Sequence, residues 1–239
     1  MREGKLCPGW ARLLAAAAIL AGCATVGCGS GGGSGGGSGS DTADVADDWK
    51  PGDYQSLPPN TCDQIARSAG ELIRGRMAVK PAHHRQRAVC TWSESKPEKR
   101  YRYLSIRLVV DKPALGPGGD VIPAVAEARS LFKQQLHADR TEGASLGEQV
   151  KAARSLHGVG DEARVFYGLA ADAGVAKLDL RKRNIELGVT VQGWNSRRRI
   201  ASDGSGVSFV NTPLRRGVVE NVATQVARHV LALLPAPPG

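Results

Sequence analysis

Two neighbouring stretches of alternating apolar and polar residues constrain the fold of this 239-residue chain most strongly. In residues 176–180 and 185–191, every second side chain is Ala, Leu, Ile or Val, and the residues between them are charged, polar or Gly. A period of two is the pattern of a β-strand with one buried face. Because only a short turn separates the two stretches, we expect an antiparallel hairpin with one face exposed to water.

The rest of the folded part contains further strands and amphipathic helices. Alternation predicts strands over residues 88–92, 103–110 and 165–169, and helical spacing predicts helices beginning near Thr61, Pro123 and Thr212. Residues 144–157 fit neither pattern. The order α-β-β-α-β-β-β-α predicts an α+β domain, with an antiparallel sheet of about five strands and helices packed on one face.

The N-terminus has the layout of a secretory signal peptide, with a basic start, an apolar run over residues 13–21 and small residues after it. That run is too short for a membrane-spanning helix, which needs roughly 20 residues. Leu20-Ala21-Gly22-Cys23 looks like a lipobox, the bacterial signal for lipid attachment. We therefore expect a lipoprotein signal peptide at 1–22, and diacylglycerol and palmitate chains on Cys23 that anchor the protein to the extracytoplasmic face of the cell membrane.

The segment after the expected cleavage point cannot form a core. Residues 29–40 contain only Gly and Ser, and an acidic stretch runs over residues 41–53. We therefore expect a flexible tether at 23–53, a single α+β domain at 54–234 and a Pro-rich tail at 235–239.

The formal net charge of +9 indicates an anionic partner. Export argues against nucleic acid, so the expected partners are the membrane, anionic lipid, wall polymer or another exported protein. The candidate residues for an anionic-ligand patch form two groups, Arg181, Lys182 and Arg183, and Arg197, Arg198 and Arg199. They form one patch if both segments lie at the same end of the sheet. The alternative is a solvated basic surface.

Three cysteines remain after the discarded Cys7 and the lipidated Cys23 are set aside, namely Cys28, Cys62 and Cys90. An exported domain lies in a compartment that permits disulfides. Because Cys62 and Cys90 lie in folded sequence and Cys28 lies in the tether, a Cys62–Cys90 disulfide is favoured over the two pairings with Cys28. The role of Cys28 stays open.

Several motifs together resemble a family of actinobacterial secreted lipoproteins classed only as a domain of unknown function. These motifs are Cys62 with Cys90-Thr91-Trp92, Gly158-Val159-Gly160-Asp161-Glu162-Ala163, and Leu180-Arg181-Lys182-Arg183-Asn184-Ile185. The resemblance implies an exported, lipid-anchored α+β domain with no known catalysis.

Catalytic chemistry is not indicated by the sequence. No His-Glu-x-x-His motif, closely spaced zinc ligands or nucleophile–base pair can be placed, so we expect no enzyme, no catalytic residues, no metal and no cofactor. The expected function is a non-catalytic binding or accessory module of the cell envelope. The alternative is a cell-envelope hydrolase with unidentified catalytic residues, which a cleft with converging carboxylates or a Ser/His pair would favour.

Overall fold

The fold is taken from a computed structural model that describes residues 48–68, 76–77, 82–96, 98–145, 151–200 and 206–235. All of these residues belong to one compact unit, Thr42–Gly239. The predicted signal peptide, Cys23, Cys28 and most of the predicted tether lie outside the described residues.

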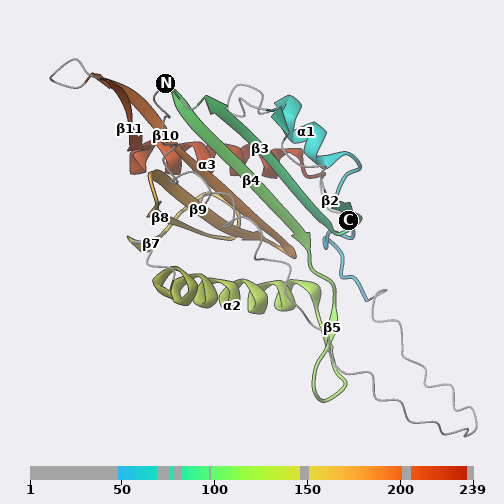
Figure 1. The fold of residues 1–239 in the computed structure, drawn as a ribbon. Coiled ribbons are helices and arrows are strands. Elements are labelled where there is room, and N and C mark those ends of the chain that lie inside the picture. Colours follow the sequence, from blue (N-terminus) through green and yellow to red (C-terminus); the bar gives the residue numbers. More distant parts are fainter. Residues whose placement is uncertain are drawn as a thin grey trace, which may run out of the picture. The chain divides into compact units, whose positions relative to one another are not determined.

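A nine-stranded antiparallel sheet forms the centre of the domain (Figure 1). The strand order is β1-β3-β4-β10-β9-β8-β7, with β2 beside β3 and β11 beside β10. The five long strands are β3 (Arg87–Lys96), β4 (Arg100–Val110), β8 (Glu162–Ala170), β9 (Ala173–Lys182) and β10 (Ile185–Ile200). The shorter ones are β1 (Arg76–Met77), β2 (Ala82–His84), β7 (Lys151–Ser155) and β11 (Val207–Pro213). A separate small hairpin consists of β5 (Ala114–Leu115) and β6 (Val121–Ile122).

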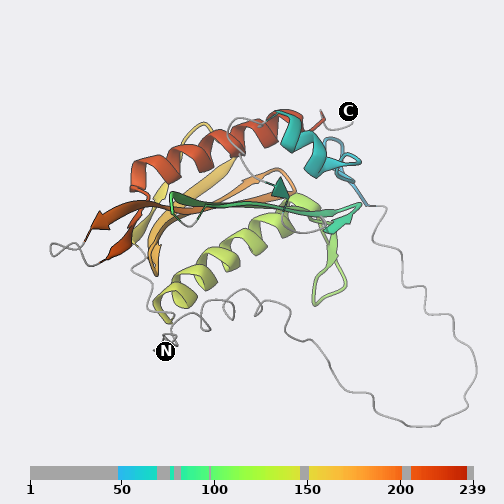
Figure 2. The ribbon, with the colours of Figure 1, turned by 45° about the horizontal axis from the view of Figure 1, so that its top comes forward.

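Helices cover both faces of the sheet. Figure 2 shows α1 (Thr61–Ser68) and α3 (Arg216–Leu233) on one face and α2 (Ala124–Ser145) on the other. The main core lies under α1 and α3, where alternate side chains of β3, β4, β8, β9 and β10 are buried. A smaller cluster of Phe132, Leu136 and Phe166 lies under α2.

The predicted class and the order of the main elements are confirmed. The prediction that all helices pack on one face is wrong, because α2 covers the face expected to be wet. The sheet is also larger than five strands, since β11 and the short edge strands extend it. Of the ambiguous residues 144–157, Lys151–Ser155 form β7 beside β8.

The predicted disulfide between Cys62 and Cys90 is confirmed. It joins α1 to β3, with a Cα–Cα distance of 5.5 Å. Trp92, two residues further along β3, is 4% exposed and belongs to the same core. Closing a loop of this length constrains the unfolded chain, which is typically worth about 3–4 kcal/mol in the chain-entropy account.

The residues just before the predicted domain boundary at residue 54 also lie on the domain. Asp53, assigned from the sequence to the tether, is 1% exposed, and its Oδ2 accepts a hydrogen bond from the Lys50 backbone N–H at 3.0 Å. The Arg183 guanidinium lies 3.9 Å from Asp53 Oδ1. The folded part therefore begins earlier than the acidic composition suggests.

Asn184, in the turn between β9 and β10, joins three segments that are far apart in the sequence. Its side chain is fully buried, and its Oδ1 accepts a hydrogen bond from the Tyr54 N–H at 2.9 Å. Its Nδ2 donates to the Tyr54 carbonyl at 2.7 Å and to the Asp111 carbonyl at 3.0 Å. The Asp111 N–H in turn donates to the Asn184 carbonyl at 2.8 Å. This turn therefore fixes both the N-terminal segment and the residue that follows β4.

We expect Asn184→Asp to lower the free energy of unfolding by about 2–4 kcal/mol, because a carboxylate cannot donate to two buried carbonyls and would face them as an acceptor. Urea denaturation measures the change. Asn221→Asp, at an exposed position on α3, is the matched control and should change stability little. Equal effects of the two substitutions would contradict the role given to Asn184.

Candidate functional site

Charged side chains line the sheet face that α2 covers. One row across β4, β10, β9 and β8 consists of Val109, Glu186, Arg181 and Glu162. The next row consists of Arg107, Gly188, Asp179 and Arg164. Opposite charges thus lie on neighbouring strands, where cross-strand pairs stabilise a sheet. This face is polar, whereas the face under α1 and α3 is apolar.

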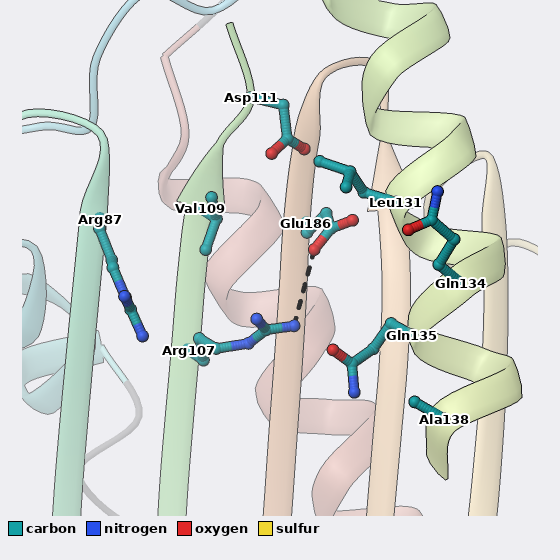
Figure 3. A pocket seen from close by; sticks show the side chains of 9 residues that line it. All are labelled: Arg87, Arg107, Val109, Asp111, Leu131, Gln134, Gln135, Ala138 and Glu186. Atoms are coloured by element: carbon teal, nitrogen blue, oxygen red, sulfur yellow. Dashed lines mark ion pairs between the residues drawn. The ribbon is translucent and has the colours of Figure 1, made fainter. Parts of the chain in front are cut away.

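A pocket of about 420 Å³ lies on this polar face, between α2 and the strands. That volume is within the range of small-molecule sites. The sheet side is lined by Arg87, Arg107, Val109, Asp111 and Glu186, and α2 contributes Leu131, Gln134, Gln135 and Ala138. Figure 3 shows that the carboxylates of Asp111 and Glu186 lie on the side of the sheet that faces α2.

Asp111 and Glu186 are the unusual members of this lining. Each is only 7% exposed, and each has a buried carboxylate oxygen without a hydrogen-bond partner, Oδ2 of Asp111 and Oε1 of Glu186. The other oxygen of Glu186 lies 3.6 Å from the Arg107 guanidinium, which is the ion pair drawn in Figure 3. A buried polar atom without a partner costs roughly 1–3 kcal/mol. The described protein residues supply no donor to these two oxygens, which lie beside one pocket.

Their surroundings shift the protonation of both carboxyls. Burial, followed by the charges of Glu186 and Glu127, raises the pKa of Asp111 to about 7, against a lowering effect of Arg107. Burial also raises the pKa of Glu186, and Arg107 again opposes the shift. Near neutral pH, Asp111 is therefore poised between a hydrogen-bond donor and a charged acceptor.

The lining of the pocket combines hydrogen-bond acceptors with apolar side chains. The free carboxylate oxygens would accept from an ammonium, guanidinium or amide, and Val109 and Leu131 offer apolar contact beside them. Among the described residues, no group of three or more His, Cys, Asp or Glu is arranged to hold a metal ion.

The predicted basic patch is not one surface. Arg181, Lys182 and Arg183 lie at the end of β9 and in the turn before β10, whereas Arg197, Arg198 and Arg199 lie near the far end of β10. β10 is 16 residues long. At about 3.3 Å per residue its ends lie roughly 50 Å apart, so the single-patch prediction is wrong.

The first group also has structural partners. Arg181 is 2% exposed, and its guanidinium lies 3.2 Å from Asp161 Oδ2 and 2.9 Å from Glu162 Oε1. Asp161 Oδ2 also accepts the Arg183 N–H at 2.7 Å, which supports the positive φ of 56° at Arg183. The two motifs that contain these residues therefore meet as one ion-paired cluster. Arg197, Arg198 and Arg199 are exposed.

Sequence reasoning missed Asp111 and Glu186. Glu186 falls on the polar side of an alternating strand, where a solvated carboxylate is the ordinary expectation. Asp111 follows a strand, a common place for an exposed acidic residue. Both are buried because the α2 stripe of Ala124, Ala128, Phe132 and Leu136 packs on that face, and the sequence does not show which face this stripe covers.

We expect the free energy of unfolding to fall by roughly 1–3 kcal/mol between pH 5 and pH 8 through Asp111. The unfolded carboxyl releases its proton near 3.8 and the folded one near 7, so protonation favours the folded state between these values. Urea denaturation across this pH range measures the slope. Asp111→Asn should flatten it, and Asp120→Asn, at an exposed loop position, should not. Equal slopes for the two variants would refute the assignment.

Comparison with known proteins gives no relative from which to transfer a function. No protein-family model matches the chain, and neither a curated protein nor a solved structure shows a significant match.

Proposed function

We propose that this chain is a membrane-anchored, extracytoplasmic lipoprotein that acts as a binding module of the bacterial cell envelope, with the pocket under α2 as its ligand site. Export and anchoring rest on the signal-like start and on Leu20-Ala21-Gly22-Cys23. The Cys62–Cys90 disulfide is consistent with an oxidising compartment. No helix in the described part of the chain is long and apolar enough to cross a membrane.

One observation carries the binding assignment. Asp111 and Glu186 each keep a buried, unpaired carboxylate oxygen beside the same pocket. A ligand with a cationic or neutral donor group would supply these oxygens with hydrogen-bond partners. Arg107 limits the negative charge by pairing with Glu186. This chemistry favours a small ligand with an ammonium or guanidinium group and a short aliphatic part.

A second candidate is the hydrolase considered above, since two carboxylates line one pocket, as that alternative requires, and a carboxyl with a pKa of about 7 beside another carboxylate is the pattern of a general acid. In that case Asp111 would donate a proton to a leaving group, and Glu186 would accept one from water. Turnover of a cell-envelope glycan by the wild type and not by Asp111→Asn would favour this candidate. If the protein is a binding module, Asp111→Asn would change only its affinity for the ligand.

We expect butylamine and putrescine to shift the backbone amide signals of Val109, Asp111 and Glu186 in NMR spectra at pH 8, which is above the pKa of Asp111. Butyrate and butanol serve as matched probes and should shift them little. The double variant Asp111→Asn/Glu186→Gln should lose the amine response, and Asp120→Asn should keep it. Equal amine responses in both variants would exclude this pocket as the binding site.

The anchor has its own test. Mass spectrometry of the mature protein from native membranes should find a diacylated Cys23 at the N-terminus. Cys23→Ser should leave the chain unprocessed or release it into the medium. An unmodified Cys23 in the wild-type protein would rule out the lipid anchor and would leave the proposal for the pocket unaffected.

A further inference from the structure

Beyond residue 195, β10 leaves the sheet and continues with β11 alone. Pairing with β4 ends at Asn195 and pairing with β9 ends at Gly193, whereas pairing with β11 runs from Trp194 to Ile200. Figures 1 and 2 show this two-stranded ribbon extending past the ends of the neighbouring strands. We call residues 196–200 and 207–211 the β10–β11 ribbon.

The ribbon exposes large apolar side chains. Ile200 is 61% exposed, Val207 50%, Phe209 43% and Val210 46%. In register, Ile200 lies opposite Val207, and Arg198 lies opposite Phe209. Because side chains alternate along a strand, Ile200, Val207, Phe209 and Arg198 share one face of the ribbon, and Val210, Arg197 and Arg199 lie on the other. A two-stranded ribbon with such a face is marginal in water, which indicates a partner surface.

The same ribbon carries a concentrated positive charge. Arg197, Arg198 and Arg199 are exposed, and no carboxylate in the described part of the chain pairs with them. The two strands, Trp194–Ile200 and Val207–Pro213, contain no Asp or Glu. The ribbon therefore places apolar and cationic side chains within a few residues of each other, and the partner surface must bind both kinds.

The base of the ribbon is firmly held. The Tyr101 and Trp194 rings stack, with centroids 6.1 Å apart. Arg102 donates to the Trp194 carbonyl at 2.6 Å and to Asn195 Oδ1. The Ser196 N–H donates to the Lys99 carbonyl at 2.8 Å. The domain thus presents the ribbon in a fixed direction.

We infer that the β10–β11 ribbon docks on an anionic lipid bilayer, with Ile200, Val207 and Phe209 in the headgroup–acyl boundary, Arg198 on lipid phosphates beside them, and Arg197 and Arg199 reaching phosphates from the other face of the ribbon. An anionic interface takes apolar and guanidinium groups together. A soluble wall polymer complements the charge of the arginines but has no apolar region that would contact the apolar face of the ribbon. A second copy of the ribbon would place like charges together. The inference does not depend on the pocket or on Cys23.

The test measures co-sedimentation of the full chain, carrying Cys23→Ser to remove acylation, with vesicles of phosphatidylglycerol and phosphatidylcholine. Each arginine at an anionic surface contributes about fivefold in partition, so Arg197→Ser/Arg198→Ser/Arg199→Ser should weaken binding roughly 100-fold. The matched control is Arg67→Ser/Arg85→Ser/Arg228→Ser, three exposed positions away from the ribbon with the same change in charge. It should weaken binding far less. Equal losses would overturn the proposal.

A second variant separates insertion from simple attraction. Ile200→Ser/Phe209→Ser keeps every charge and should weaken partition at least tenfold, and raised salt should weaken binding of the wild type. Circular dichroism confirms that each variant is folded. Unchanged binding of this variant, equal binding to vesicles of phosphatidylcholine alone, or a concentration-dependent dimer that Phe209→Ser abolishes would each refute bilayer docking.

Discussion

The buried amide of Asn184 is the contact on which the arrangement of the domain depends. One acceptor and two donors of this side chain are all used, on Tyr54 and Asp111. Among uncharged side chains, only an amide offers two N–H donors together with an oxygen acceptor on one short planar group. The contact closes the β9–β10 turn against the N-terminal segment and against the end of β4. It thereby places Asp111 at the edge of the polar face, one residue beyond the strand that carries Arg107 and Val109.

The two faces of the sheet differ in the interactions that stabilise them. Under α1 and α3, alternate side chains from every long strand bury together, which supplies most of the apolar burial. Under α2, a narrow apolar stripe covers a face that is otherwise charged, so the cations and carboxylates must pair across strands. Arg181 with Asp161 and Glu162 is the satisfied part of that face. Asp111 and Glu186, where α2 leaves a pocket, are the part that retains unpaired oxygens.

The five long strands, the three helices and the disulfide could be predicted from the sequence because each depends on local periodicity or on compartment, whereas the short strands and β11 were not predicted. The side of the sheet that α2 covers could not, since an amphipathic stripe says which residues are buried but not against which face. The prediction of a single basic patch was wrong for a related reason. The alternation used to predict the last strand ends at residue 191, but β10 continues through residues 197–199 and carries them to the opposite end from Arg181. The pocket depends on which face α2 covers and on the course of β10. No sequence pattern therefore indicated that Asp111 and Glu186 lie together.

The fold buries Asp111 near the negative charges of Glu186 and Glu127, beside the pocket under α2. A carbon-detected NMR titration of the side-chain carboxyls in the full chain measures this directly. We predict that Asp111 titrates near 7 and that Arg107→Gln raises the pKa of both Asp111 and Glu186, because Arg107 lowers both in the native protein. An Asp111 carboxyl that titrates near 3.8 and does not respond to Arg107→Gln would contradict the account.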